Sequence, residues 1–279
     1  MAGAEAIGDA VYEAVRSAAV TLRPDVATAL RLAHDRERSE RGRAVLGQLL
    51  ANAEIAARDG VPLCQDTGTV WVWVELGAEE CLRVPLQPVV DAAVARAYSD
   101  CSLRMSIVRD ALLDRTNTGD NTPASFDLTL RPGRGATVHV MLKGGGSDNA
   151  SAVAMLAPSA GMAGVREFIL TTVAEKATGA CPPLVVGAGV GGTFDTVAKL
   201  AKKALLRPVG ERADDPRLAA FETDVLDAVN ATGIGPAGLG GDTTALDVSV
   251  VTAPCHIAAL PVAVNLGCSA VRSVTVEVT

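Results

Sequence analysis

The chain has 279 residues, and 49% of them are hydrophobic, which is enough to bury a sizeable core. Its formal net charge of −7 argues against a nucleic-acid partner, because such proteins need a basic surface to neutralise phosphates. No apolar run approaches the roughly 20 residues of a membrane span, so no membrane insertion is expected. The first residues lack a basic stretch followed by an apolar one, and a cytoplasmic location is therefore expected.

The first 60 residues have the periodicity of helices. Apolar side chains recur every three or four positions in two stretches, which are Ile7, Val11, Val15 and Ala19, and then Val45, Leu49, Ala53 and Ala56. Pro24, between the two stretches, suits the first turn of a short helix because its missing N–H has no partner there in any case. We expect residues 1–60 to form a helical N-terminal layer.

After Gly60 the sequence alternates strand-like and helix-like segments. Period-two apolar patterns predict strands over 70–74, 126–130, 137–142, 246–251 and 274–278. Helical patterns lie near 86–98, 160–177, 193–206 and 216–230. No linker composition or internal repeat interrupts the chain. The prediction is a single domain over 1–279 of the α/β class (mixed α+β), with a mixed β-sheet and packed helices after the helical layer. Its closing strand would leave a sheet edge that a partner chain could cover.

Six cysteines are too sparse for a disulfide scaffold and are better interpreted as thiols. Three of them lie in turns rich in glycine and proline: Cys64 in PLCQDTG, Cys181 in TGACPP and Cys268 in NLGCS. Their separations match neither a zinc finger nor a ferredoxin, so spacing alone predicts no site. The other three, Cys81, Cys101 and Cys255, are interpreted as ordinary core or surface thiols.

The segment Gly187–Gly192 satisfies the dinucleotide-binding fingerprint and follows the apolar run 184–186. The second strand and the acidic residue about 20 positions further on are missing, since 207–212 has a loop composition. We interpret these glycines as a tight entry to a helix and expect no nucleotide site.

Six ordered segments resemble the α domain of class I fumarases and the related L-tartrate dehydratases. They are PLCQDTG (62–68), NTGDNTPA (117–124), KGGGSDNAS (143–151), TGACPP (178–183), GIGPAGLGGDTTALDV (233–248) and HIAALPVAVNLGC (256–268). The resemblance implies a 4Fe-4S cluster held by Cys64, Cys181 and Cys268. It also implies that the fourth iron has no protein ligand, acts as a Lewis acid on the substrate, and makes the enzyme sensitive to oxygen.

The resemblance also assigns residues around the cluster. Asp66 is similar to a residue that transfers a proton or orients His256. His256 is similar to the active-site histidine of the family, which is either a substrate hydrogen-bond donor or a general acid/base. Substrate contacts are implied for Gln65, for Arg104, whose guanidinium matches a carboxylate, for Gly145 and, more weakly, for Lys143. A turn-stabilising role before Thr67 and Gly68 stays an alternative for Asp66.

By this resemblance the chain is expected to be the α subunit of a fumarate hydratase (EC 4.2.1.2), a hydro-lyase of the tricarboxylic acid cycle that interconverts fumarate and (S)-malate. The sequence stops before the second domain of single-chain relatives, so a β subunit is expected to complete the site in a symmetric hetero-oligomer. Two alternatives stay open: an L-tartrate dehydratase α subunit, and a non-enzymatic cluster-binding or sensing protein.

Overall fold

A computed structural model describes residues 3–279. The chain forms two compact units, each assembled from segments that are distant in sequence. Unit 1 comprises residues 1–23, 53–145 and 272–279, and unit 2 comprises residues 24–52 and 146–271. The chain passes between the units several times, so they are not consecutive domains, and the expectation of a single domain over 1–279 stays a prediction.

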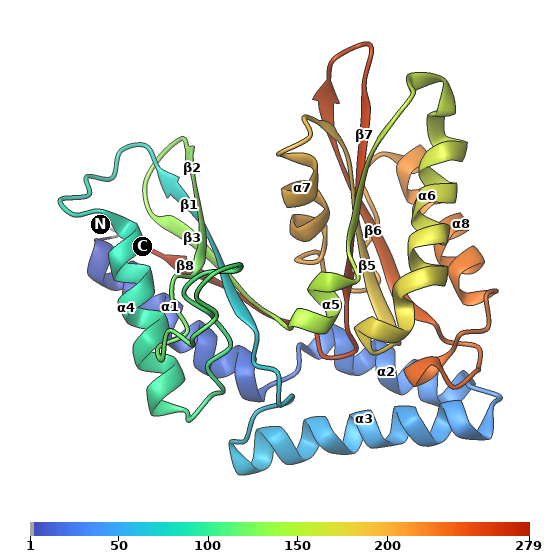
Figure 1. Cartoon of the computed structure of the whole chain (residues 1–279), viewed down its shortest axis with the longest axis horizontal. Coiled ribbons are helices and arrows are strands. Elements are labelled where there is room, and N and C mark those ends of the chain that lie inside the picture. Colours follow the sequence, from blue (N-terminus) through green and yellow to red (C-terminus); the bar gives the residue numbers. More distant parts are fainter. Residues whose placement is uncertain (1–2) are drawn as a thin grey trace. The chain divides into compact units, whose positions relative to one another are not determined.

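Unit 1 is built on a mixed four-stranded sheet of order β2-β1-β3-β8 (Figure 1). The strands are β1 (Thr69–Gly77), β2 (Ser125–Arg131), β3 (Ala136–Lys143) and β8 (Arg272–Val278). Strand β1 pairs parallel with β2 and antiparallel with β3, and β3 pairs antiparallel with β8. Two helices, α1 (Ala4–Val20) and α4 (Leu86–Asp100), belong to this unit. Strand β8 is an edge strand, as the sequence predicted for the closing strand.

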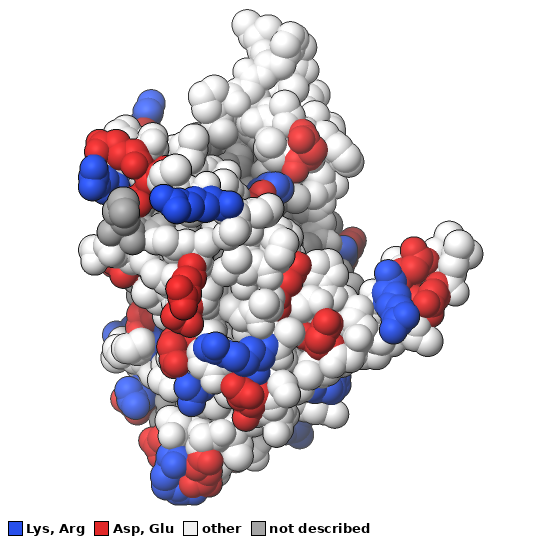
Figure 2. Space-filling view, turned by 90° about the vertical axis from the view of Figure 1, so that its left-hand side faces the viewer, with Lys and Arg blue, Asp and Glu red and all other residues white. Residues whose placement is uncertain are grey.

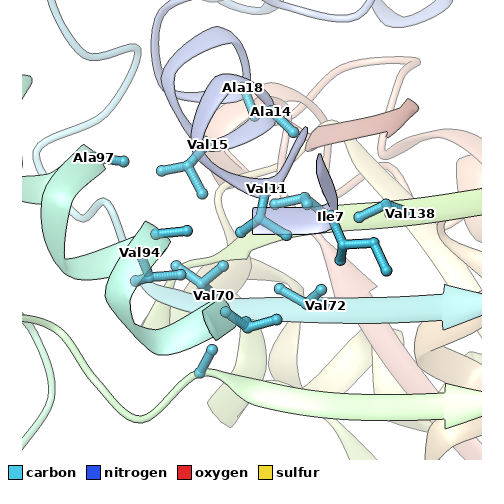
Figure 3. Packing of buried hydrophobic residues seen from close by; sticks show 14 of the residues in the cluster. Ile7, Val11, Ala14, Val15, Ala18, Val70, Val72, Val94, Ala97 and Val138 are labelled. Carbon is cyan, nitrogen blue, oxygen red and sulfur yellow. The ribbon is translucent and has the colours of Figure 1, made fainter. Parts of the chain in front are cut away.

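The core of unit 1 lies between helix α1 and one face of the sheet (Figure 3). Every second residue of β1 points to one face of the sheet, which buries Val70 and Val72. Every fourth residue of α1 lies on one side of the helix, which buries Ile7 and Val11 against that face. Each fully buried side chain of this kind contributes about 1.5–3 kcal/mol, so α1 and the sheet fix each other.

Unit 2 contains a second mixed sheet, of order β4-β7-β5-β6. Its strands are β4 (Ala152–Leu156), β5 (Leu184–Gly192), β6 (Ala245–Cys255) and β7 (Leu260–Gly267). Its helices are α2 (Pro24–Arg36), α6 (Gly161–Lys176), α7 (Val197–Ala204) and α8 (Pro216–Asn230). Short 3-10 turns cover Pro158–Ala160, Ala177–Ala180 and Pro236–Gly238. Helix α3 (Glu40–Asp59) and the short α5 (Gly145–Asn149) have residues in both units.

The glycines of 187–192 have a role that differs from the sequence interpretation. They lie inside strand β5 rather than at the entry to a helix. A Cβ on Gly189 would lie 2.5 Å from the Val197 carbonyl oxygen and 2.6 Å from the Ala201 nitrogen. The missing side chain therefore lets the backbone of α7 lie directly against the strand. The helix-entry interpretation is wrong, because a strand that must touch a helix backbone has the same glycine-rich composition.

The predicted fold class is confirmed: helices occupy the N-terminal 60 residues, and the five predicted strands and four later helices are present. Strands β4, β5 and β7 were not predicted. They are short, glycine-rich or uniformly apolar, and therefore lack the alternation that marks a half-buried strand.

Two further observations concern the helices and the charges on one face of the molecule. None of the helices described here is both long and apolar enough to cross a membrane. On the face shown in Figure 2, acidic and basic side chains are interspersed, and neither sign forms a continuous patch.

Candidate active site

The loop that carries Cys64, Gln65 and Asp66 in unit 1 is anchored on both sides of these residues. The buried Leu63 donates its backbone N–H to the Ala19 carbonyl at 2.8 Å. The buried Thr67 donates its hydroxyl to the Arg104 carbonyl at 2.7 Å. Between these anchors, Cys64 and Gln65 are exposed and Asp66 is half-buried. The loop thus presents its polar side chains while its ends are fixed.

Two buried side chains bind the carbonyls at the end of this loop. The Tyr98 hydroxyl lies 2.9 Å from the Thr67 oxygen and 3.0 Å from the Gly68 oxygen. The Asn121 amide donates to the Gly68 oxygen at 3.1 Å. Burial raises the pKa of Tyr98 to about 12, so its hydroxyl remains a donor at neutral pH. The NTGDNTPA segment therefore supports the cysteine loop through Asn121.

Gly68 joins the loop to the end of strand β3. Its φ of +79° is in the region that residues with a side chain rarely adopt. A Cβ at this position would clash with the Lys143 carbonyl oxygen. The loop and the glycine segment that follows Lys143 are consequently held in backbone contact.

The contact between these segments positions Asp66. The Gly145 backbone N–H donates to Asp66 Oδ2 at 2.7 Å. Arg104 Nη2 lies 3.8 Å from Asp66 Oδ1, and its side chain is 52% exposed. Asp66, Arg104 and Gly145, which the sequence placed in one site, therefore lie together in unit 1, next to the exposed Gln65. Lys143 lies at the same end of β3, but its side chain is buried.

Sequence reasoning missed three residues of this region. Tyr98 and Asn121 support the loop, and the buried Arg272 lies near Gly144 and Asp66. Asn121 lies in the segment NTGDNTPA, which resembles the family, so the sequence contained a signal that could have identified it. No sequence signal identifies Tyr98 or Arg272. A tyrosine in a helix and an arginine at the start of a strand are common, and only the fold shows what they contact.

Cys181 and Cys268 lie side by side in unit 2. Strands β5 and β7 are antiparallel, and their ladder ends at the pair Val185 and Gly267. Cys268 follows that end directly, and the Ser269 N–H donates to the Cys181 carbonyl at 3.2 Å. Cys181 has a φ of +55°, which turns the chain sharply before β5. Two cysteines separated by 87 residues are thus brought together by one strand pair.

A buried polar group lies beside this pair of cysteine loops. Lys202 Nζ lies 2.9 Å from Asp148 Oδ1, and Asn265 donates to Asp148 at 3.3 Å and to the Ser151 hydroxyl at 2.9 Å. Burial lowers the pKa of Lys202 despite its acidic partner. Because Asn265 precedes Cys268 by three residues on β7, these bonds fix the strand that carries the cysteine.

His256 lies elsewhere in unit 2. It is exposed in the turn between β6 and β7, where its Nδ1 accepts the Ala258 N–H at 3.1 Å. Cys268 is at the other end of β7, whose eight residues span about 26 Å at a rise of about 3.3 Å each. The structure therefore does not bring His256 to Cys181 and Cys268 of its own chain.

The sequence of the chain matches that of a known protein family. Residues 8–277 match the sequence profile of the family described as "Fumarate hydratase (Fumerase)". The chain belongs to the class I fumarate hydratase and L-tartrate dehydratase family. The match covers both units and every candidate residue named above.

Relatives in this family are similar over nearly their whole length. A protein of Methanocaldococcus jannaschii, provisionally named L(+)-tartrate dehydratase subunit alpha, is 41% identical over 275 residues, which is 95% of each chain. The L(+)-tartrate dehydratase subunit alpha of Escherichia coli strain UTI89 is 34% identical over 259 residues, covering 91% of this chain and 84% of the relative. The same-named protein of strain K12 is 33% identical over the same length.

Members of this iron–sulfur hydro-lyase family hold a cluster on thiolates, and the cysteines here fit that chemistry. None of the six cysteines forms a disulfide in the described part of the chain, Cys64 and Cys181 are exposed, and Cys268 is half-buried. Cys64 belongs to unit 1, whereas Cys181 and Cys268 belong to unit 2. Within residues 3–279, no three His, Cys, Asp or Glu side chains are gathered as they would be around a metal ion. The donor set thus fits by type and access, and two of its members are already adjacent.

Proposed function

We propose that this chain is the α subunit of a hydro-lyase that adds water to fumarate and removes it from (S)-malate. The observation that carries the proposal is the constellation in unit 1: an exposed cysteine, a carboxylate and an exposed guanidinium on one rigid loop system. The family match supports the reaction class.

The proposed cluster ligands are Cys64, Cys181 and Cys268. A 4Fe-4S cluster bound there would supply a Lewis-acidic iron next to the substrate. The backbone N–H groups of the cysteine turns could then hydrogen-bond to the cluster sulfides.

The other residues bind the substrate and transfer a proton. Arg104 offers its planar fork of donors to a substrate carboxylate, and Gln65 and the Gly145 backbone offer further donors. The Gly145 N–H fixes the orientation of Asp66 while leaving Oδ1 open toward Arg104, which suits a group that must accept or release a proton at one place. Lys143 stays in the proposed set as its weakest member, because its side chain is buried.

We also propose a proton-transfer role for His256, on the condition that it serves a cluster held by another chain. Since β7 separates it from Cys268, it cannot serve a cluster held by Cys181 and Cys268 of its own unit 2. The histidine would have to serve a cluster on another chain of the assembly. A symmetric hetero-oligomer with a β subunit, proposed because the relatives are named alpha subunits, provides such neighbours.

L-tartrate is the second candidate substrate, and the names of the relatives favour it. It differs from malate by one hydroxyl, so the same site chemistry serves both. Initial rates with fumarate, (S)-malate and L-tartrate, measured on the anaerobically reconstituted αβ complex, separate the two. A cluster-loaded complex that turns over none of them would support the non-enzymatic alternative.

Asp66→Asn tests the assignment of the site. We expect kcat to fall by about 100-fold or more with an unchanged iron content, because general acid–base catalysis contributes factors of this size. Asp59→Asn is the matched control, since Asp59 is an exposed aspartate paired with Arg58. Full activity of the Asp66→Asn complex would contradict the proposed role.

A further inference from the structure

The loop of residues 233–244, called the 233–244 loop below, contacts the turn of Cys181 within unit 2. The Ala237 N–H donates to the carbonyl of Pro182, the residue after the cysteine, at 2.8 Å. A bound backbone carbonyl of this kind fixes the peptide to which it belongs. The loop therefore holds the chain directly after Cys181.

Two further contacts join the same two segments. The Leu184 N–H donates to the Thr244 carbonyl at 2.8 Å, at the start of strand β5. A Cβ on Gly238 would lie 2.8 Å from Thr178 Cγ2, so the loop also packs closely against the residues that precede the cysteine. The 233–244 loop thus contacts the chain on both sides of this candidate ligand.

The backbone of the 233–244 loop needs support from neighbouring elements. Five of its residues have a positive φ, which are Gly235, Ala237, Gly238, Gly240 and Gly241. Ala237, with a φ of +54°, adopts a conformation that is unfavourable for a residue with a Cβ. The groups that bind the loop from outside must therefore offset this cost.

Glu37 provides such support from the end of helix α2. Its side chain is fully buried, and its carboxylate accepts the Asp242 N–H at 2.9 and 3.0 Å and the Thr243 N–H at 3.1 Å. The Ser39 N–H donates to Oε1 at 3.1 Å. A carboxylate suits this place because its two oxygens only accept, whereas a neutral amide would turn a donor toward one of these N–H groups.

Glu37 is itself fixed between helices α2 and α3. Its N–H donates to the Ala33 carbonyl at 2.9 Å, and its carbonyl accepts Arg43 Nη2 at 2.6 Å. A Cβ on Gly42 would lie 2.9 Å from Glu37 Cδ, so the backbone of α3 packs against the carboxyl group. Because burying a charge costs free energy, a fixed loop conformation explains this residue better than a gain in stability does.

We propose that Glu37 is a positioning residue for the cluster: by fixing the 233–244 loop, it holds Cys181 where the thiolate can bind iron. This inference rests on the proposed function, which supplies the cluster. It adds a residue that lies outside the six segments resembling the family and acts on the ligand through the backbone of another loop.

Glu37→Gln in the αβ complex tests this role, because it keeps the shape of the side chain and removes its charge and one acceptor oxygen. In the cluster-free complex, the peptides 177–185 and 233–244 should exchange amide hydrogens about 10-fold faster, since hydrogen bonds to a charged group are lost. The peptide 62–68 of unit 1 should exchange at the wild-type rate.

The reconstituted complex gives two further measurements on Glu37→Gln. Iron should be lost about 10-fold faster than from the wild type, because removing a group that orients a metal ligand lowers metal affinity by about this factor. The electron paramagnetic resonance spectrum of the reduced cluster should also differ from that of the wild type, since it reports the geometry of the thiolate ligands.

Two variants separate positioning from charge and from general stability. Glu40→Gln removes an exposed carboxylate in the first turn of α3 and should leave exchange, iron loss and spectrum at wild-type values. Val225→Ala truncates a fully buried core residue of α8 and should lower the denaturant midpoint without changing the cluster spectrum. The same spectral change in Val225→Ala as in Glu37→Gln would contradict the positioning role.

Thr244→Val tests the loop from its other end while Glu37 stays intact. It removes the hydroxyl that accepts the Gly235 N–H at 3.1 Å, and it should shift exchange and iron loss in the same direction by a smaller factor. If the Glu37→Gln chain does not fold, this variant decides the question. Wild-type exchange and iron loss in Thr244→Val would then contradict the role of the 233–244 loop.

The results distinguish this inference from the proposed function. A wild-type complex that binds no cluster contradicts the proposed function itself. A wild type that binds its cluster, together with a Glu37→Gln complex that has unchanged exchange in both peptides or an unchanged rate of iron loss, contradicts only the role of Glu37.

Discussion

The Arg104 guanidinium is half-exposed and lies 3.8 Å from Asp66, too far for a strong pair. Its charge is therefore available to a ligand instead of being used in the fold. A doubly anionic substrate needs such groups, because the chain as a whole carries a net charge of −7.

Because the Arg104 charge is available to a ligand, the substitution Arg104→Ala should weaken substrate binding. The KM for the dicarboxylate should rise at least about 10-fold, since charged hydrogen bonds are lost, while iron and sulfide content stay at wild-type values. The measurement is initial-rate kinetics on the αβ complex, with metal analysis of the same sample. An equal loss of cluster and substrate affinity would mean that Arg104 is structural.

At the residue scale, the sequence predicted Asp66, Arg104 and Gly145 as neighbours by resemblance, and the structure brings them together. It could not predict Arg272, because burial of a charged residue depends on which strand covers it. The placement of His256 also required the fold, since only the direction of β7 reveals that the motif HIAALPVAVNLGC has its two functional ends far apart.

At the element scale, the cysteine loop depends on helix α4 through Tyr98. Tyr98→Phe should destabilise the protein by about 1 kcal/mol, because the carbonyls of Thr67 and Gly68 lose a buried donor. The variant should also retain the cluster less well, as its loop is less fixed. Chemical denaturation and the rate of iron loss measure the two effects.

The pH dependence of stability gives this variant a second signature. The folded pKa of Tyr98 is about 12, above its ordinary value of 10.0. The folded state therefore keeps a proton that the unfolded state has released, and stability from this group is complete below pH 10 and lost as the pH rises toward 12. This decline should be shallower in Tyr98→Phe. Parallel curves for the two proteins would show that the hydroxyl is not buried.

The contact of α7 with β5 makes another prediction at this scale. Gly189→Ala should destabilise unit 2 by about 3 kcal/mol, because the new Cβ would lie 2.5 Å from the Val197 carbonyl and force the helix away. Gly179→Ala is the control, since its Cβ would meet nothing within 4 Å, and it should stay within about 0.5 kcal/mol of wild type. Equal midpoints in denaturant would contradict the strand role of Gly189.

The helices and strands that have one buried face and one solvent-exposed face could be predicted from the sequence. Strand β1 and helix α8 show their periodicity directly. Strand β5 does not, because both its faces are covered and its glycines serve a helix contact. Local pattern thus predicts amphipathic elements well and fully buried ones poorly.

At the scale of the whole molecule, the candidate residues are divided between two units. The loop with Cys64, Asp66 and Arg104 belongs to unit 1, and the pair Cys181 and Cys268 belongs to unit 2. The chain passes repeatedly from one unit to the other, so neither can be removed as an independent domain. This division could not be predicted from the sequence, because no linker composition marks it.

The expected β subunit gives a prediction at this scale. The reconstituted α chain alone should bind its cluster but turn over dicarboxylates at least about 100-fold more slowly than the αβ complex, because substrate-positioning and acid–base groups contribute factors of this size. Activity assays with and without the partner test it. Full activity of the α chain alone would contradict a divided active site.

The central claim is that three distant thiols hold one iron–sulfur cluster. Anaerobic reconstitution followed by iron and sulfide analysis and visible absorption tests this most directly, in the wild type and in Cys64→Ser, Cys181→Ser and Cys268→Ser, with Cys81→Ser as the control. We predict one 4Fe-4S cluster per chain in the wild type and the control, and its loss in each of the three variants. A wild type without cluster absorption, or a full cluster in any of the three variants, would contradict the account.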